Sequence, residues 1–393
     1  MQAFMYHVPT KVIFGRGTES QAGQAVKAEG GSTVLVLYGG GSAVKSGLLD
    51  RVTASLTESG LDWFVKGGVQ ANPLLSFVEE TLAEYRDKGI DFILGVGGGS
   101  VLDTAKALAV GFPRPEVPVW NYYSGKDIPL TAIPVGAVLT IAAAGSETSD
   151  STVITNAATR EKRGFNSALH RPRFAIMNPE LTYTLPPYQT ACGVCDIMMH
   201  TLDRYFSDLE GNTLTDELAE AILRTTASFG RVALEHPDDY EARSELMWCG
   251  SLSHNNLTGL GRTKDFTVHQ LGHELSGRYG VAHGASLAVM WPAWARYVWK
   301  QDPARFARLG RKVFDVREQD EEQAALVAIA AVEDCFRGLG LPVTLSQSEV
   351  GVVSDEELEA LALGCSRNKT RRVGSFCPLD HDGLLAVYRA ANR

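Results

Sequence analysis

The sequence predicts two domains, an α/β domain over residues 1–185 and an all-helical domain over residues 186–393. The chain has 393 residues, more than a single hydrophobic core usually accommodates. Its first half alternates short apolar runs with helical stretches, which is typical of a parallel sheet covered by helices. From Tyr188 onward the apolar residues follow helical spacing. Pro186 and Pro187 mark the boundary, because prolines favour helix starts and extended entry segments.

Two glycine-rich turns each follow a predicted buried strand. Residues 33–37 lead into Tyr38-Gly39-Gly40-Gly41-Ser42, and residues 92–96 lead into Gly97-Gly98-Gly99-Ser100, where a helix begins at once. Glycine lets the backbone approach a phosphate closely, and the first N–H groups of a helix attract an anion. Ligands of open parallel sheets bind at this end of the strands, so the two turns favour a dinucleotide. The complete dinucleotide fingerprint and a Walker A sequence are both absent, and simple tight turns are the alternative.

The other predicted elements follow from spacing and capping. Residues 130–139 form a third buried run in the α/β half. Apolar residues at helical spacing predict helices over residues 74–88, around residues 214–222 (Leu214, Leu218 and Ile222) and over residues 318–336. A capping box at Ser354 and Glu357 predicts the start of another helix.

Two helical motifs in the second half place acidic and imidazole side chains on common faces. Asp196 and His200 lie four residues apart, as do His269 and His273, and residues four apart share one helix face. His283 follows after two glycines have broken the second helix. One carboxylate with several imidazoles from separate elements is a ligand set for a divalent transition metal. A single histidine is more often a structural residue, so the prediction depends on the whole set.

Composition and charge exclude several classes of protein. The net charge of −9 argues against nucleic acid and anionic membranes as partners. No apolar run reaches the roughly 18 residues needed to span a bilayer, and the N-terminal segment lacks the features of a signal peptide. The six cysteines include Cys192 and Cys195 at C-x-x-C spacing, but no second pair completes a zinc knot. We therefore expect buried, reduced thiols and a cytoplasmic protein.

The ordered motifs resemble those of the iron-containing alcohol dehydrogenases over nearly the whole chain. The resemblance is greatest to the branch of NADPH-dependent butanol dehydrogenases and aldehyde reductases. It implies a Rossmann-like dinucleotide-binding domain followed by an all-α metal-binding domain. The matching motifs are residues 38–42, Gly97-Gly98-Gly99-Ser100 with Asp103 and Lys106, Gly145-Ser146-Glu147, residues 178–187, Asp196-x-x-x-His200, and His269-x-x-x-His273 with His283.

The resemblance assigns roles to individual residues. It implies that the metal ligands are Asp196, His200, His269 and His283, and that His273 lies beside the metal without binding it. It implies cofactor contacts within the glycine turns and beyond them, at Gly39, Gly40, Gly41, Ser42, Asn72, Gly97, Gly98, Gly99, Ser100, Asp103, Thr140 and Lys162. One position departs from the family: the usual Gly-Thr before Gly145 is Ala143-Ala144, which removes a hydroxyl that would face the cofactor.

The activity implied is hydride transfer between NADP(H) and a small primary alcohol or aldehyde. A divalent ion polarises the carbonyl, and His273 is the side chain that spacing places best to move a proton. Fe²⁺ is the metal implied by the resemblance and Zn²⁺ is the alternative, since both accept nitrogen and oxygen ligands. The family also suggests a homodimer.

The end of the first glycine-linked strand predicts a preference for NADP(H) over NAD(H). Enzymes that select NAD usually place a carboxylate there to bind the ribose 2′-hydroxyl. The chain has Gly39 to Gly41 instead, with no acidic residue before Asp50, and Lys45 nearby. NAD-preferring members of the family look as if they carry an Asp at about the position of Gly39.

Two other functions stay open. A lyase of the dehydroquinate synthase class uses nicotinamide transiently, but it needs a basic pocket, and only Lys264 and Arg278 lie in the metal-binding stretch. An inactive binding protein on the same fold would be recognised by loss of a metal ligand, and all four are present.

Overall fold

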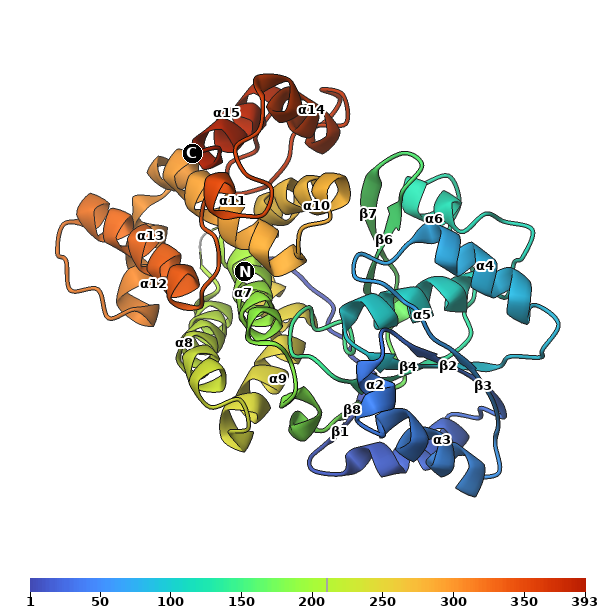
Figure 1. The fold of residues 1–393 in the computed structure, drawn as a ribbon. Coiled ribbons are helices and arrows are strands. Elements are labelled where there is room, and N and C mark those ends of the chain that lie inside the picture. The colour runs from blue at the N-terminus through green and yellow to red at the C-terminus, as the bar shows by residue number, and fades with distance from the viewer. Residues whose placement is uncertain (210) are drawn as a thin grey trace. The chain divides into compact units, whose positions relative to one another are not determined.

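A computed structural model describes residues 1–209 and 211–393, which divide into two compact units (Figure 1). His7–Thr184 form an α/β unit, and Leu185–Arg393 form a helical unit. The predicted fold class is confirmed. Met1–Tyr6 belong with the helical unit, where the Gln2 N–H donates to the Gly261 carbonyl at 2.9 Å. The sequence patterns gave no indication of this return of the N-terminal residues.

The α/β unit is built on a parallel sheet. Within His7–Thr184, all of which the structure describes, six strands lie in the order β1-β8-β5-β4-β2-β3. The strands are β1 (Lys11–Phe14), β2 (Thr33–Tyr38), β3 (Asp62–Lys66), β4 (Phe92–Gly97), β5 (Val135–Leu139) and β8 (Phe174–Met177). Tyr38 is paired with Val96, and Gly97 is paired with Leu139. The carboxyl ends of β2, β4 and β5 therefore lie side by side.

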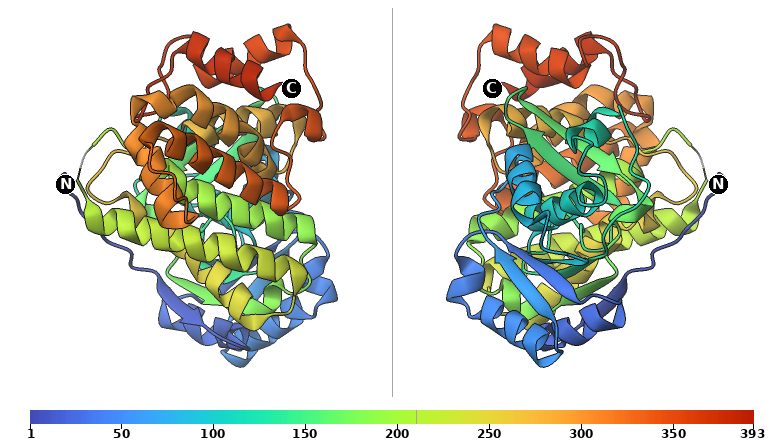
Figure 2. Two further views of the ribbon diagram at one scale, coloured as in Figure 1. Left: turned by 90° about the vertical axis from the view of Figure 1, so that its left-hand side faces the viewer. Right: turned by 90° about the vertical axis from the view of Figure 1, so that its right-hand side faces the viewer.

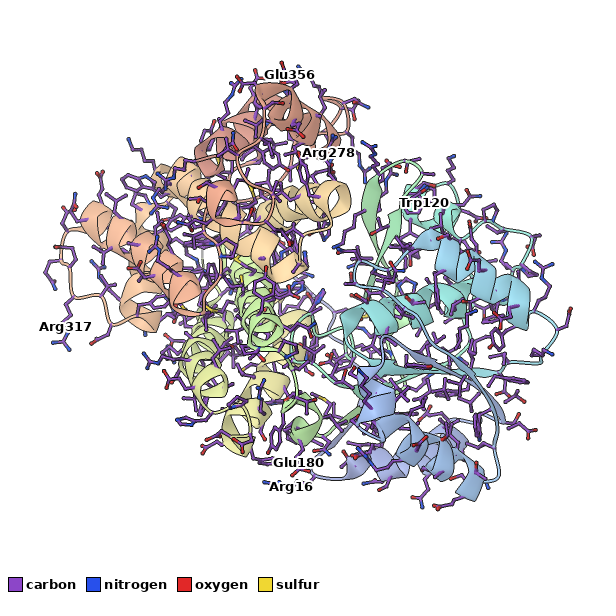
Figure 3. The ribbon with its side chains drawn as sticks, viewed as in Figure 1. Arg16, Trp120, Glu180, Arg278, Arg317 and Glu356 are labelled. Carbon is purple, nitrogen blue, oxygen red and sulfur yellow. The ribbon has the colours of Figure 1, made fainter. Side chains whose placement is uncertain are left out.

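Both faces of this sheet are covered by helices because its central strands are apolar on both sides. Val34 and Val36 belong to a core made with α1 (Ala22–Ala28) and α3 (Leu48–Glu58). Leu35 and Leu37 belong to a core made with α4 (Leu75–Tyr85), α5 (Gly99–Gly111) and α6 (Trp120–Ser124). In Figure 1, α3 lies on one side of the sheet and α4 and α5 lie on the other. An ion pair between Arg16 and Glu180 joins the loop after β1 to η3 (Figure 3). The helices are η1 (Thr18–Gln21), α1 (Ala22–Ala28), α2 (Ser42–Lys45), α3 (Leu48–Glu58), α4 (Leu75–Tyr85), α5 (Gly99–Gly111), α6 (Trp120–Ser124), η2 (Ala168–His170) and η3 (Pro179–Thr182).

An antiparallel hairpin interrupts the expected parallel pattern. β6 (Ser151–Asn156) pairs with β7 (Glu161–Asn166), and the turn between them includes Arg160 at φ 55° (Figure 2, right). This hairpin was not predicted from the sequence. β7, Glu-Lys-Arg-Gly-Phe-Asn, is largely polar and lacks the apolar run by which the other strands were found.

The helical unit consists of helices that pack side by side (Figure 2, left). Its aromatic core includes Trp291, Trp294, Phe306, Phe336 and Tyr388, each almost fully buried. The capping box at Ser354 is confirmed at the start of α14. The helices are α7 (Pro187–Tyr205), α8 (Thr213–Glu235), α9 (Tyr240–His254), η4 (Leu257–Gly259), α10 (Thr267–Tyr279), α11 (His283–Val298), η5 (Trp299–Gln301), α12 (Pro303–Val313), α13 (Glu321–Gly338), η6 (Leu345–Gln347), α14 (Asp355–Cys365) and α15 (His381–Ala391). In the described part of the chain no helix is both long and apolar enough to cross a membrane.

The helix predicted around residues 214–222 is confirmed as part of α8, which buries two carboxylates as well as the apolar Ile222. Leu214 is 68% exposed, whereas the carboxylates of Asp216 and Glu220 are buried. Arg305 binds Asp216 through two nitrogens at 2.6 and 2.7 Å, and Arg308 donates to Glu220 at 2.6 Å. Because buried carboxylates need such partners, the burial of Asp216 and Glu220 was not recognisable from apolar spacing.

Candidate metal centre and dinucleotide-binding edge

Three helices of the helical unit bring the predicted metal ligands together. Asp196 and His200 are one turn apart on α7, His269 lies in the first turn of α10, and His283 is the first residue of α11. From Asp196 Oδ1, the Nε2 atoms of His200, His269 and His283 are 3.4, 3.6 and 3.8 Å away. Candidate ligand atoms of Asp196, His200 and His269 all lie within 4.8 Å of one another.

The unsatisfied polar atoms of this cluster fit a metal ion. Within the described residues, Asp196 Oδ1 and His269 Nε2, which face each other at 3.6 Å, are both buried and have no hydrogen-bond partner. Leaving such groups buried and unpaired costs free energy, so each one needs a reason. Ligands bonded at about 2.1 Å to one tetrahedral ion lie about 3.4 Å apart, close to the spacings around Asp196 Oδ1.

Electrostatics also favour a metal-binding state of the imidazoles. Burial, together with the neighbouring His254 and His269, lowers the pKa of His200 well below its usual value. The neutral ring keeps a lone pair for a metal. Burial opposes the charge on His269 as well, but Asp203 and Asp196 raise its pKa overall. A metal ion at Nε2 would compete with that proton.

Asp203 is a functional candidate that was not predicted from the sequence. Its Oδ2 lies 2.5 Å from His269 Nδ1, and it is 1% exposed. A carboxylate on one ring nitrogen fixes the ring and turns the other nitrogen toward a metal. Asp203 follows Asp196 by seven residues, two helical turns, and this spacing could have identified it.

Two rings close around the ligands, and neither was predicted. His254, the last residue of α9, stacks on His200 with ring centroids 3.9 Å apart. Phe266 lies 5.3 Å from the His269 ring and has φ 57°, an unusual backbone conformation for a bulky residue. These rings leave less room for water around His200 and His269. Neither position carried a local sequence signal, because each is brought in by tertiary packing.

His273 lies beside the ligand set. Its ring centroid is 6.3 Å from that of His269 and 5.2 Å from that of His283. The side chain is half-buried, whereas Asp196, His200 and His269 are buried. This position suits a group that reaches a substrate next to the metal.

The predicted dinucleotide turns meet at one edge of the sheet in the α/β unit. The turns at residues 39–42 and 97–100 follow the adjacent strands β2 and β4, and Thr140 follows β5 on the other side of β4. The Thr140 N–H donates to the Gly97 carbonyl at 3.1 Å. The helix α5 starts at Gly99 with no side-chain cap, so its first N–H groups can serve an anion.

Close packing is a second reason why glycine occupies two of these positions. A Cβ on Gly97 would lie 2.5 Å from Val101 Cγ2, and one on Gly98 would lie 2.3 Å from Ile141 Cγ2. A Cβ on Gly40 would meet nothing within 4 Å. Gly97 and Gly98 are thus required by their neighbours, whereas Gly40 borders open space.

The remaining predicted cofactor residues are held by internal contacts. Asp103 accepts hydrogen bonds from the Ser146 hydroxyl at 2.8 Å and the Val153 N–H at 3.1 Å. Lys162 on β7 donates to Asn72 Oδ1 at 2.8 Å, and Asn72 has φ 54°. These bonds tie the β6–β7 hairpin to the sheet edge. Direct contact of Asp103, Asn72 and Lys162 with a cofactor stays a prediction.

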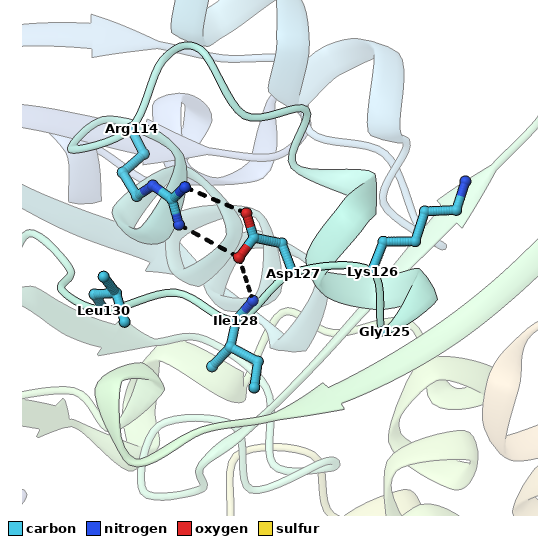
Figure 4. A pocket seen from close by; sticks show the side chains of 6 residues that line it. All are labelled: Arg114, Gly125, Lys126, Asp127, Ile128 and Leu130. Atoms are coloured by element: carbon cyan, nitrogen blue, oxygen red, sulfur yellow. Dashed lines mark hydrogen bonds and ion pairs between the residues drawn. The ribbon is translucent and has the colours of Figure 1, made fainter.

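A surface hollow near α6 contains none of the predicted site residues. Arg114 pairs with Asp127, which also accepts the Ile128 N–H at 2.7 Å, and Lys126 points away (Figure 4). In this hollow Arg114 and Asp127 neutralise each other, and the exposed Ile128 and Leu130 supply no reactive group.

Comparison with known proteins agrees with this arrangement. Residues 9–179 match the family described as iron-containing alcohol dehydrogenase, and residues 190–392 match the Fe-containing alcohol dehydrogenase family, C-terminal. The chain is 37% identical to NADH-dependent butanol dehydrogenase A of Clostridium acetobutylicum over 99% of both chains. It is also 37% identical to the NADPH-dependent aldehyde reductase YqhD of Escherichia coli over the full length of both. A crystal structure of NADH-dependent butanol dehydrogenase A from Thermotoga maritima superposes with a TM-score of 0.95 at 35% identity, covering 100% of this chain and 99% of that one.

Proposed function

The chain belongs to the iron-containing alcohol dehydrogenase family, and on that premise we propose that it interconverts small primary alcohols and aldehydes with a nicotinamide cofactor. The observation that carries the proposal is the buried donor set. Asp196 Oδ1 and His269 Nε2 face each other at 3.6 Å without a hydrogen-bond partner in the described chain. A member of this family that had become a mere binding protein would have no need to keep such a set.

Metal binding, cofactor binding and proton transfer are assigned to different residues of the two units. When bound, a divalent ion supplies a Lewis acid for the carbonyl oxygen, and the nicotinamide supplies or accepts the hydride. Asp196, His200, His269 and His283 hold the ion, while the Asp203 carboxylate orients His269. The N-terminus of α5 holds the cofactor's phosphates. A ring nitrogen of His273 donates a proton to the substrate oxygen when an aldehyde is reduced, and accepts that proton when an alcohol is oxidised.

The metal is proposed to be Fe²⁺, in keeping with the family description. Three imidazole nitrogens and one carboxylate oxygen also suit Zn²⁺. Metal analysis of protein purified without oxygen, followed by reloading with each ion, distinguishes the two. The resemblance also motivates the proposal of a cytoplasmic homodimer, and light scattering after gel filtration measures its mass.

NADP(H) is the proposed preferred cofactor, although the relatives include both NADH-dependent and NADPH-dependent enzymes. β2 ends at Tyr38 and is followed by glycines, with open space beside Gly40 and an exposed Lys45 on α2. The sequence from Tyr38 to Lys45 contains no carboxylate that could repel a 2′-phosphate. Steady-state kinetics with one aldehyde should give a higher kcat/KM for NADPH than for NADH. Gly39→Asp should reverse the preference and Gly40→Ala, whose Cβ enters open space, should not. A ratio near one or in favour of NADH in the unaltered protein overturns the proposal.

Activity is tested by the loss of NADPH absorbance when butanal is added to the Fe²⁺- or Zn²⁺-loaded protein. His283→Ala should abolish turnover and leave NADPH binding, measured by cofactor fluorescence, largely intact. A lyase would show no net consumption of NADPH, and an inactive binding protein would bind NADPH without turnover. Parallel loss of metal and cofactor binding in folded His283→Ala would contradict the assignment of the two sites to different units.

A further inference from the structure

Lys106 is a buried cation enclosed by the oxygen atoms of one short segment. Its side chain is 0% exposed. In the described structure its Nζ lies 2.6 and 2.8 Å from the carbonyl and hydroxyl oxygens of Ser146, and 2.8 Å from the Ser151 carbonyl. The carbonyl and hydroxyl of Ser149 lie at 3.2 and 3.4 Å. An ammonium group has three protons, fewer than these oxygens, so the arrangement resembles coordination of a monovalent cation by carbonyls and hydroxyls.

Further contacts confine the same segment, residues 146–151. Arg171 donates to the Thr148 carbonyl at 2.6 Å and to Asp150 Oδ2 at 3.1 Å. The Ser146 hydroxyl, which accepts from Lys106, donates to Asp103 at 2.8 Å. Burial lowers the pKa of Lys106 to about 8, with Asp103 among the groups that oppose this change, so the amine is charged at neutral pH. The segment is therefore folded around positive charge.

Lys106 connects two parts of the sheet edge described above. It lies on α5, two turns after the uncapped first residue, Gly99. The segment that it binds continues the loop that begins at Thr140 after β5. In that loop Ala144 Cβ lies 3.4 Å from where a Cβ on Gly99 would stand, so the loop packs against the start of α5. A change in residues 146–151 would be transmitted to this contact.

We propose that Lys106 is a positioning residue that acts as the built-in monovalent cation of residues 146–151, and that it thereby shapes the edge where the dinucleotide binds. The cation role stands on the contacts alone, whereas the effect on the dinucleotide rests on the proposed function. Neither the hydride nor the proton passes through Lys106. Its removal should act on cofactor affinity and leave metal content unchanged.

The test replaces the side chain and offers the cation back. Lys106→Ala leaves a hole that methylammonium can fill, Lys106→Met fills the hole with an uncharged chain, and Lys126→Ala removes an exposed lysine of the same unit as a control. Two quantities are measured: hydrogen exchange of residues 146–151, and the Kd of NADPH by fluorescence. Both Lys106 variants should exchange faster and bind NADPH about tenfold more weakly or worse. Methylammonium should restore Lys106→Ala only, and tetramethylammonium at equal ionic strength should restore neither variant.

Each other outcome has a fixed meaning. Unchanged exchange in Lys106→Ala, or equal recovery with tetramethylammonium, overturns the cation role. Faster exchange that methylammonium reverses, with an unchanged Kd for NADPH, supports the cation role and overturns the proposed place of the dinucleotide. If Lys106→Ala is insoluble, refolding yields are compared in the two salts: a higher yield in methylammonium supports the proposal, and equal yields overturn it.

Discussion

Each ring nitrogen of His269 faces a carboxylate. Asp203 binds Nδ1 at 2.5 Å, and Nε2 faces Asp196 at 3.6 Å. The first contact determines which nitrogen remains for a metal. The orientation of His269 therefore depends on a carboxylate outside the proposed ligand set.

Replacing this carboxylate by its amide should weaken metal binding without unfolding the protein. Asp203→Asn keeps the shape of the side chain but removes its charge, and such changes typically cost about 10–100-fold in metal affinity. Competition with a fluorescent chelator measures the affinity, and Asp208→Asn, at an exposed acid nearby, is the control. Equal affinities in the two variants would show that Asp203 only stabilises the fold.

His273→Ala should keep its metal and turn over slowly. The ring lies 5.2 Å from that of His283, yet the proposed ligand set is complete without it. A lost acid–base group typically costs about 10²–10⁴-fold in rate. Metal content and kcat are measured on the same preparation. Loss of the metal instead would make His273 a ligand and the assignment wrong.

At the scale of single residues, the sequence predicts those site residues whose positions follow from local spacing. Asp196 and His200 were found because residues one turn apart share a helix face. Asp203 lies two helical turns after Asp196, so the same spacing argument could have identified it. His254 was not, because its stacking on His200 arises from the packing of α9 against α7. The oxygen cage of Lys106 was equally hidden, since it depends on how residues 146–151 fold.

Among the elements, α7 and α11 approach closely beside the proposed metal centre. A Cβ on Gly284 would lie 2.1 Å from the Cys192 carbonyl oxygen and 2.7 Å from the Cys192 Cα. These are backbone atoms, which cannot move aside as a flexible side chain could. Gly284 follows His283 directly, so this contact fixes where His283 stands relative to Asp196.

Gly284→Ala should push α11 away from α7, lowering both stability and metal affinity. Overpacking of this kind typically costs about 1–3 kcal/mol or more of unfolding free energy. Thermal unfolding and metal titration measure the two effects. Gly338→Ala at the end of α13, where a Cβ would meet nothing within 4 Å, is the control and should not destabilise. An unchanged unfolding midpoint for Gly284→Ala would mean that the helices adjust at no cost.

Elements were predictable wherever one physical signal dominated. The apolar runs of β2 and β4 identified these strands to within one residue. The run at residues 130–139 gave a strand only from Val135, because Pro134 lacks the N–H group that a sheet ladder requires, and Leu130 is 80% exposed. The β6–β7 hairpin was missed although β6 contains the β-branched run Thr152–Thr155, because its partner β7 is polar and gives no apolar signal.

At the scale of the whole molecule, the proposed metal ligands all belong to the helical unit. Removing the metal with a chelator should therefore destabilise this unit selectively, since an ion present at about 100 times its Kd contributes about 2.7 kcal/mol. Hydrogen exchange should increase in α7, α10 and α11 and change little in β2 and β4. Addition of NADPH should protect the β2 and β4 turns instead. Uniform loss of protection on chelation would indicate that the two units unfold as one.

The return of Met1–Tyr6 to the helical unit makes the α/β unit an insertion in chain topology, entered after Tyr6 and left after Thr184. Met1 and Arg393 therefore belong to the same unit. A pair of fluorophores attached at these two positions would report a constant distance however the α/β unit turned. An optical sensor of domain motion needs one dye at such an end and the other inside the insertion, for example at the exposed Lys126.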